Sequence, residues 1–506
     1  MKAQVLEKLY AIDRECCYLE NAAAILEWDA DTYLPPDGVK DRSEQLAVLK
    51  GIHHDRFTVP EIGRLLAELG VDEQNPRGDE KLSPQERDFL KVFGREYRRA
   101  VKLPGDLVRE AARAEKISQA AWVEARKNND FSAFEPHLKT VIDLAKKKAH
   151  CWGFEGKAVY DGLLDLHEPG MTAADISAIF KPLRESLSAL IRKIAAKPQE
   201  DFSFLKENFP ADAQAVLNRK IAERLGFDYK RGRLDVTVHP FTTSLGFDDV
   251  RITTRYFPDN FFSGIFSTIH ESGHAFYELG LSPEIRGSCL AGGVSMGIHE
   301  SQSRLWENVI GRSRAFWQGQ YPLVKEIFPD ILAKVDCETF YKAANQVKSS
   351  LIRVDADEVS YSLHIILRFE LEQRLFSGEL DTSELPSAWR KMMKEYLGIE
   401  NETDADGVLQ DVHWSSGSFG YFPSYALGNL YGLQFYQTLN HALPQAEQNI
   451  AAGNFTAIHQ WLRDTIYTWG RRLDPAELLQ KVTGAKLSAQ PFLDYIEVKY
   501  NGRYGL

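Results

Sequence analysis

The amino-acid sequence predicts a mainly α-helical protein, with one large helical body that carries a small antiparallel β-sheet. Apolar residues recur at spacings of three and four over most of the chain, whereas β-branched residues alternate with a period of two in only one short region. The 506 residues also contain no Ser/Gly-rich linker, low-complexity tract or internal repeat that would mark a domain boundary. We therefore expect a single domain over residues 1–506, with a helical N-terminal part up to about residue 230.

The chain is expected to open with a long amphipathic helix that ends before the breaker pair Pro35-Pro36. Its apolar face consists of residues three and four positions apart, namely Val5, Leu9, Ile12, Cys16, Leu19, Ala23 and Leu26. A second clear helix begins at Thr172, which forms a capping-box-like start with Asp175, and ends near Pro198. Further stretches of helical period cover residues 105–128, 137–150, 211–226, 300–312, 339–352, 359–378 and 455–470.

The exception to helical periodicity lies between Arg233 and Tyr256. Residues 234–238 and 250–254 are rich in β-branched side chains at alternating positions, and a turn containing Gly246 lies between them. We expect these two segments to form the small antiparallel sheet.

The composition indicates a folded, water-soluble protein, because 44% hydrophobic and 26% charged residues are both close to the averages for globular proteins. The 61 Lys and Arg residues are outnumbered by 72 Asp and Glu residues, which gives a net charge of −11. Proteins that bind nucleic-acid phosphates usually present a basic surface, so we expect no nucleic-acid partner.

The chain contains an odd number of cysteines at scattered positions, namely Cys16, Cys17, Cys151, Cys289 and Cys337. None belongs to a C-x-x-C pair that would bind zinc or carry out redox chemistry. The N-terminus lacks an export signal, and no apolar run of about 18 residues occurs. We therefore expect a cytoplasmic location and no membrane partner.

The strongest chemical signal is an H-E-x-x-H motif in the helical run of residues 266–280. On an α-helix, positions i and i+4 are about 40° apart around the axis, so His270 and His274 project side by side and can bind one zinc ion. Glu271 lies about 100° further round, where it can reach a water molecule at the metal without being a ligand. These residues predict a hydrolytic zinc site.

A catalytic zinc ion needs a third protein ligand. No third histidine follows at the spacing of metzincins, so we expect a carboxylate from another helix, and Glu300 at the start of the next amphipathic segment is the candidate. Glu278 is a poorer candidate because it lies about 12 Å along the helix axis from His270. The alternative for Glu300 is a solvated charge that interacts with the helix dipole.

Residues 293–297 spell G-x-S-x-G and raise the alternative of a serine hydrolase with Ser295 as nucleophile. That motif requires a strong buried strand directly before it, and residues 286–291 do not form a convincing strand. We therefore do not expect Ser295 to be a nucleophile.

Six short elements, in order along residues 239–414, resemble the carboxypeptidase Taq family of zinc metallocarboxypeptidases. Its H-P-F, D-x-R-x-T, H-E-x-x-H, H-E-S-(G/Q), (I/V)-R-x-x-A-D and G-x-x-Q-D-x-H-W elements are matched by residues 239–241, 249–253, 270–274, 299–302, 352–357 and 407–414. Each element is weak by itself, but the ordered set is specific.

The resemblance implies a mainly helical enzyme with a deep active-site groove that releases single residues from peptide C-termini with broad specificity. It also implies a cytosolic protein that is often a homodimer. In that family the motif histidines and the glutamate of the H-E-S element hold Zn²⁺, which corresponds here to His270, His274 and Glu300. Glu271 corresponds to the catalytic residue, and Co²⁺ is expected to substitute for Zn²⁺.

A carboxypeptidase must bind the free C-terminal carboxylate of its peptide substrate. Arginine suits this group because it donates two parallel hydrogen bonds, and the matched elements offer Arg353 and Arg251. Each also has a structural alternative, which is an ion pair of Arg353 with Asp355 or Asp357 and of Arg251 with Asp249. The sequence leaves both alternatives open.

Further candidates for substrate contact are His413, Tyr421 and His239. His413, and likewise Tyr421 and Tyr425, are candidates to donate a hydrogen bond to the carbonyl oxyanion or to orient a ligand. The alternative is that they belong to an aromatic core. His239, ahead of a proline at the end of the predicted sheet, contacts substrate or is a buried histidine with satisfied nitrogens.

Two other functions remain open at this stage. One is a zinc oligopeptidase or dipeptidyl carboxypeptidase of similar helical fold. The other is a helical scaffold whose H-E-x-x-H helix has no catalytic activity.

Overall fold

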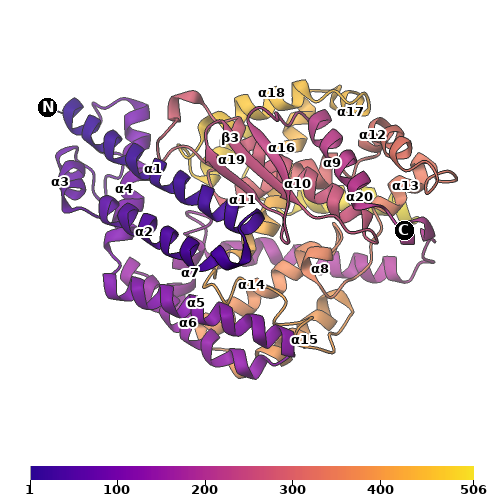
Figure 1. Ribbon diagram of the computed structural model, residues 1–506, viewed down its shortest axis with the longest axis horizontal. Helices are drawn as coiled ribbons and strands as arrows, with labels where there is room; N and C mark the ends of the chain where they lie inside the picture. Colours follow the sequence, from indigo (N-terminus) through magenta and orange to yellow (C-terminus); the bar gives the residue numbers. More distant parts are fainter. Residues whose placement is uncertain (1) are drawn as a thin grey trace.

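The computed structural model describes residues 2–506, with the exception of the side chain of Lys157. The N-terminal helices are α1 (Lys2–Thr32), α2 (Val39–Phe57), α3 (Pro60–Glu68), α4 (Pro84–Val101), α5 (Gly105–Asn128), α6 (Phe131–Trp152), α7 (Val159–Leu164), α8 (Ala173–Ala195) and α9 (Ala211–Leu225). Figure 1 shows α1 and α2 above α5 and α6 on one side of the molecule.

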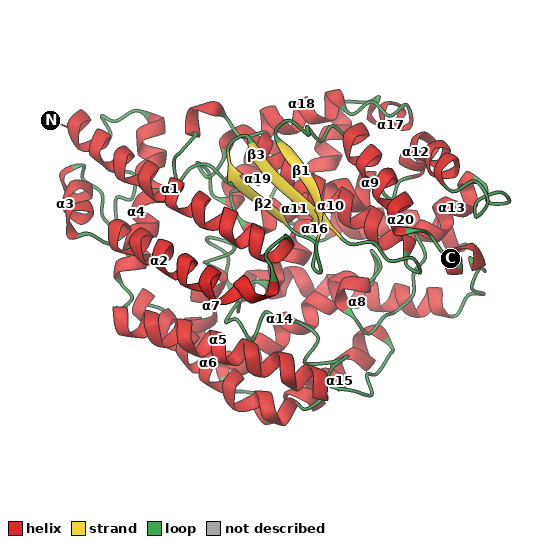
Figure 2. Ribbon diagram, viewed as in Figure 1, coloured by secondary structure: helices red, strands yellow, loops and turns green. Residues whose placement is uncertain are grey.

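The later helices are α10 (Phe261–Leu279), α11 (Met296–Arg304), α12 (Arg314–Ile327), α13 (Cys337–Ala344), α14 (Tyr361–Ser377), α15 (Leu385–Leu397), α16 (Phe422–Ala442), α17 (Ala446–Ala451), α18 (Thr456–Thr465), α19 (Pro475–Thr483) and α20 (Gln490–Tyr504). The mainly α prediction is confirmed, as Figure 2 makes plain. Buried apolar residues from Val5 to Tyr500 form one continuous cluster.

The predicted helix boundaries hold best where capping residues are clear. Thr172 accepts a hydrogen bond from the backbone of Asp175, and the Asp175 carboxylate accepts one in return, which completes the predicted capping box at the start of α8. The predicted helix over 339–352 is too long, because α13 ends at Ala344. The side chain of Asn345 donates to the carbonyl of Tyr341 and closes the helix there.

The predicted helix over 300–312 is also divided. α11 ends at Arg304 and continues as a π-helical turn over Leu305–Ile310. π-turns are rare and occur often at functional sites. The hydrophobic period alone does not distinguish such a turn from an α-helix.

The sheet is mixed, and the predicted antiparallel pairing of 234–238 with 250–254 is wrong. β1 (Gly232–Val236) is parallel to β3 (Asp249–Thr254), and β2 (Thr242–Gly246) is antiparallel to β3 on its other side. The turn after Gly246 therefore joins β2 to β3. The short polar strand β2 was missed because its residues carry no apolar alternation.

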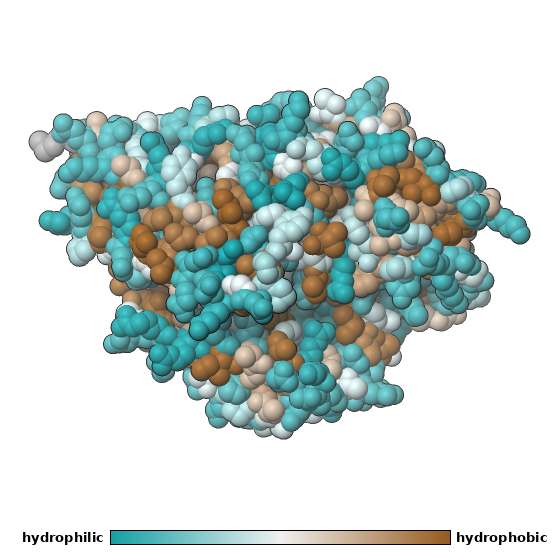
Figure 3. Space-filling view, viewed as in Figure 1, coloured by the Kyte–Doolittle hydropathy of each residue, from teal (hydrophilic) through white to brown (hydrophobic). Residues whose placement is uncertain are grey.

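The sheet and three helices form the centre of the molecule. β3 and β2 pack against α10, and α11 lies between α10 and α16. Figure 3 shows that the surface is hollowed near the middle of the viewed face, between the upper part with the sheet and the lower part with α5, α6 and α15. No helix among residues 2–506 has the length and apolar character needed to cross a membrane.

Glycines allow the backbones of these three helices to approach closely. A Cβ atom on Gly273 of α10 would lie 2.7 Å from the backbone of Ser303 on α11. On the opposite side of α11, a Cβ on Gly428 of α16 would lie 2.5 Å from Cγ of Glu300, and one on Gly432 would lie 2.7 Å from the Ser301 carbonyl oxygen. α11 is therefore held between two glycine-lined surfaces, and Glu300 is part of that contact.

The first prediction concerns this contact. Gly428→Ala should force α16 away from Glu300 and lower the free energy of unfolding by about 1–3 kcal/mol, because the close-packed interior has no room for the added methyl group. Urea denaturation measures the change.

Gly502→Ala on α20 is the matched control, because a Cβ there meets nothing within 4 Å. It should leave stability unchanged or raise it slightly, since alanine favours a helix over glycine. Equal stability of Gly428→Ala and the wild-type protein would contradict the packing argument.

Candidate metal centre

Three side chains from two helices converge on one point. His270 and His274 project from α10 and Glu300 from α11, and their donor atoms lie within 4.8 Å of one another. The Glu300 Oε2 atom is 3.7 Å from Nε2 of His270 and 3.3 Å from Nε2 of His274. Two imidazoles and one carboxylate are the donor set of catalytic zinc sites, so these residues fit a metal ion.

Burial and nearby charges give Glu300 and His274 the protonation states that a metal requires, whereas burial would lower the pKa of His270 but the charge of Glu300 raises it above the usual value. Burial alone would raise the pKa of Glu300, but the charges of Arg304 and His270 outweigh burial and hold it well below the usual range. Burial lowers the pKa of His274 to about 3. At neutral pH the carboxylate is therefore ionised and His274 is neutral, as ligands must be.

Arg304 is a buried cation that contacts two carboxylates of the site. Its Nε atom donates to Oε1 of Glu300 at 2.6 Å, and its Nη1 atom donates to Oε2 of Glu307 at 3.1 Å. Oε2 of Glu307 also lies 2.8 Å from Nδ1 of His270. The carboxylate of Glu307 thus orients His270 from the side opposite Glu300, which is a common arrangement behind metal-binding histidines.

Sequence reasoning missed Glu307 and Arg304. Both lie on the helical segment predicted to carry Glu300, so the only available signal was their spacing from Glu300, four residues for Arg304 and seven for Glu307. Glu307 lies within the π-turn, and an assumption of regular α-helix does not establish where its side chain projects.

Glu271 is almost fully buried, with 6% of its surface exposed. Its Oε2 atom accepts a hydrogen bond of 2.6 Å from Oγ1 of Thr242 on β2, and burial raises its pKa above the usual value. One carboxylate oxygen is therefore fixed by the sheet. The sequence held no signal for Thr242 beyond its place directly after the H-P-F element.

Arg353 lies in a second, buried charge cluster. Its Nε and Nη2 atoms donate to Oδ1 of Asp411 at 3.0 and 2.9 Å, and Nε of Arg368 donates to Oδ2 of the same carboxylate at 2.7 Å. The structural alternative named Asp355 or Asp357 as the partner, and the structure places Asp411 there instead. Two guanidinium groups share one carboxylate, so the cluster carries a net positive charge.

Tyr361 connects the two clusters. Its hydroxyl accepts a hydrogen bond of 3.0 Å from Nη1 of Arg353, and the guanidinium of Arg304 lies 4.0 Å from the centre of its ring. The arginine cluster and the His-His-Glu group are therefore joined through a single side chain.

His413 and Tyr421 lie beside the arginine cluster. Nε2 of His413 is 3.2 Å from the hydroxyl of Tyr425, and the ring of Tyr425 lies 5.0 Å from the guanidinium of Arg353. The rings of His413 and Tyr421 are 5.7 Å apart. Burial, reinforced by the charge of Glu300, raises the pKa of Tyr421 to about 12, so its hydroxyl stays protonated and able to donate.

Arg251 and His239 do not join these clusters. Arg251 forms an ion pair of 2.8 Å with Asp249, as its structural alternative stated, and stacks 4.2 Å over the ring of Trp28. His239 is exposed and directly follows Val238.

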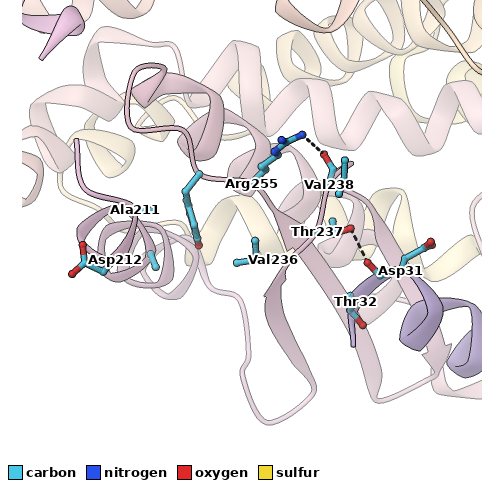
Figure 4. A pocket seen from close by; sticks show the side chains of 10 residues that line it. Asp31, Thr32, Ala211, Asp212, Val236, Thr237, Val238 and Arg255 are labelled. Atoms are coloured by element: carbon cyan, nitrogen blue, oxygen red, sulfur yellow. Dashed lines mark hydrogen bonds between the residues drawn. The ribbon is translucent and has the colours of Figure 1, made fainter. Parts of the chain in front are cut away.

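Val238 lines an open pocket of about 640 Å³ between the ends of α1, α9 and β1, together with Asp31, Thr32, Ala211, Asp212, Ala215, Val236, Thr237, Arg255 and Tyr256 (Figure 4). No residue of the His-His-Glu group lines this pocket.

Ser295 is an N-cap and not a nucleophile elbow. Its Oγ atom accepts a hydrogen bond of 3.0 Å from the backbone N–H of Ile298, and no strand is assigned to residues 286–294. The geometry that a serine hydrolase requires is therefore absent from this segment.

Comparison with known proteins places this geometry in a family. The family model described as carboxypeptidase Taq (M32) metallopeptidase matches residues 8–500. The chain belongs to this family. The predicted resemblance is confirmed, and the chain is a metallocarboxypeptidase, as the H-E-x-x-H helix and its neighbours indicated.

Similar proteins cover the whole length of the chain. Thermostable carboxypeptidase 1 of Thermus thermophilus is 42% identical over 99% of both chains, and carboxypeptidase 1 of Bacillus subtilis is 38% identical over 100% of both. The crystal structure of the M32 carboxypeptidase from Deinococcus radiodurans superimposes with a TM-score of 0.95 at 38% identity, covering 99% of this chain and 100% of that one.

Membership of a metallopeptidase family implies a metal ion, and among the described residues the His-His-Glu group is a set of three side chains close enough together to hold one. The alternative of a catalytically idle scaffold has no support from these relatives.

Proposed function

We propose that this metallocarboxypeptidase uses zinc and releases single amino acids from the free C-termini of peptides with broad specificity. The observation that carries the proposal is that Arg304 and Tyr361 connect the His-His-Glu group to the buried, net-positive cluster of Arg353 and Arg368. Arg304 contacts the ring of Tyr361, and the hydroxyl of Tyr361 accepts a hydrogen bond from Arg353. A peptide whose last bond lies at the first group would bring its terminal carboxylate towards the second.

His270, His274 and Glu300 would hold the Zn²⁺ ion, because their donor atoms converge and because the lowered pKa values of His274 and Glu300 suit the binding of a cation. When bound, zinc would polarise the scissile carbonyl and lower the pKa of a water molecule. Co²⁺ accepts similar ligands and is expected to substitute.

Glu271 would act as general base and then as general acid. It would accept a proton from the attacking water and pass this proton to the nitrogen of the leaving amino acid. The raised pKa suits this exchange, since a carboxylate with an ordinary pKa is a weaker base. The hydrogen bond from Thr242 would hold one carboxylate oxygen while the other works.

Arg353 is our choice for binding the terminal carboxylate; Asp411 would hold it in place, and Arg368 holds Asp411 in turn. Arg251 is a weaker choice, because its guanidinium already forms an ion pair with Asp249. His413 and Tyr421 would donate hydrogen bonds to the substrate near its C-terminal end, and exposed His239 would contact it further away.

We also propose that the chain is a cytoplasmic homodimer that folds as a single domain over residues 1–506. The five cysteines are free, which suits a reducing compartment, and the single cluster of buried apolar residues supports one folding body. The homodimer rests on the family resemblance alone.

The second prediction tests the base. Glu271→Gln removes the proton acceptor but keeps the size of the side chain, so kcat should fall by about 10²- to 10⁴-fold while zinc content is unchanged. Zinc is measured by atomic absorption and turnover by amino-acid release. Glu284→Gln, at an exposed position, is the control and should retain full activity. Near-normal turnover of Glu271→Gln would refute the mechanism.

The third prediction tests recognition of the C-terminus. Arg353→Lys keeps the positive charge against Asp411 but loses the planar fork, so kcat/KM for free-carboxylate peptides should fall by about ten- to a hundredfold. C-terminally amidated peptides, which lack the charged group, should lose less.

Arg251→Lys is the matched control and should affect both kinds of substrate little. Equal losses on both substrates by Arg353→Lys would show that Arg353 is structural. Mass spectrometry of the products also shows how many residues each cleavage releases, and release of dipeptides would favour the alternative dipeptidyl carboxypeptidase.

A further inference from the structure

His299 lies between the candidate ligand His274 and the largely buried carboxylate of Glu278. Its Nδ1 atom is 2.6 Å from Nδ1 of His274, and its Nε2 atom is 2.8 Å from Oε1 of Glu278. All three side chains are more than four-fifths buried. Glu278 and His274 project from the same face of α10, four residues apart, and His299 reaches them from α11.

The donors and acceptors of His274, His299 and Glu278 can be arranged in one way that leaves Nε2 of His274 free to bind a metal. The Glu278 carboxylate only accepts, so His299 carries its proton on Nε2 and donates it. In this arrangement Nδ1 of His299 offers a lone pair, which accepts the Nδ1–H of His274. Nε2 of His274, the atom 3.3 Å from Glu300, is left without a proton.

We propose that His299, held by Glu278, is a positioning residue that fixes the tautomer and ring orientation of His274 for metal binding. This inference rests on the proposed function, in which His274 is a ligand. It also explains Glu278, whose position on α10 is too far from His270 for a ligand but is one helical turn from His274.

The two candidate histidine ligands would then be supported differently. Nδ1 of His270 faces the carboxylate of Glu307, whereas Nδ1 of His274 faces the imidazole of His299. A carboxylate partner raises the basicity of a ligand histidine more than a neutral acceptor does. The hydrogen bonds of His299 to His274 and Glu278 therefore position His274 without placing another full negative charge directly against it.

The reverse arrangement is incompatible with the site. If His299 donated its Nδ1–H to His274, the proton of His274 would reside on Nε2, where the metal must bind. The lone pair at Nε2 of His299 would in addition face the Glu278 carboxylate. Loss of His299 or of Glu278 permits the tautomer of His274 with its proton on Nε2, and should therefore weaken metal binding.

The test is the zinc affinity of His299 variants, measured by competition with a chromophoric chelator. His299→Phe keeps a flat ring between Tyr277 and His274 but offers no acceptor, so the dissociation constant should rise about ten- to a hundredfold. In His299→Asn the side-chain oxygen occupies the place of Nδ1 and can accept from His274, so affinity should stay within about threefold of wild type. Glu278→Gln should fall between the two.

A spectroscopic signature accompanies the affinity. In the Co²⁺-loaded protein, His299→Phe should shift the visible absorption bands, because a ligand that turns changes the geometry at the metal. His299→Asn should retain the wild-type bands.

His459→Phe is the matched control. His459 is also a partly buried histidine against α10, with its ring 4.6 Å from that of Phe276, but its Nε2 atom is hydrogen-bonded to the carbonyl oxygen of Leu225. This variant should bind zinc like the wild type, and thermal melts of all metal-free variants verify that they fold.

The outcomes separate this inference from the proposed function. If His274→Ala binds zinc as tightly as wild type, the proposed ligand set fails. If His274→Ala loses zinc but His299→Phe binds it normally, only the role of His299 fails. Equal weakening by His299→Phe and His299→Asn would also overturn that role, because ring packing rather than an acceptor would then be the cause.

Discussion

The close approach of α10, α11 and α16 is the constraint on which the rest of the structure depends. Gly273 on one side and Gly428 and Gly432 on the other allow α11 to lie almost in backbone contact with both neighbours. Glu300 is thereby brought to within 4 Å of both histidines, and His299 to His274. The sheet adds Thr242 at Glu271. The candidate centre is thus assembled from rigid elements, as a site that must hold its geometry requires.

Charge balance is the second requirement, because Glu271, Glu300 and Glu307 lie buried near the candidate metal position and Glu278 is largely buried beside them. Arg304 pairs with both Glu300 and Glu307, Arg312 also pairs with Glu307, and His299 is hydrogen-bonded to Glu278. Burial of such groups without partners costs several kcal/mol. The arginine cluster around Asp411 has the opposite imbalance, a net positive charge inside a protein of net charge −11. Recognition of a negative peptide end therefore has to be local.

Much of the candidate site could be predicted from the sequence where function depends on local spacing. Helix geometry brings the side chains of His270 and His274 together because they are four residues apart, and Glu300 follows from the search for a carboxylate on the next helix. The partner of Arg353 could not be predicted, since Asp411 is 58 residues away and only tertiary packing brings them together. Glu307 was hidden by the π-turn, and the order of the three strands was hidden because β2 has no apolar alternation.

The most direct test of the central claim is a crystal structure of the zinc-loaded protein with anomalous diffraction recorded on both sides of the zinc absorption edge. The account predicts one strong anomalous peak about 2.0–2.2 Å from Nε2 of His270, Nε2 of His274 and a carboxylate oxygen of Glu300. A peak elsewhere, or a zinc ion bound with Glu300 turned away towards Arg304 alone, would contradict it.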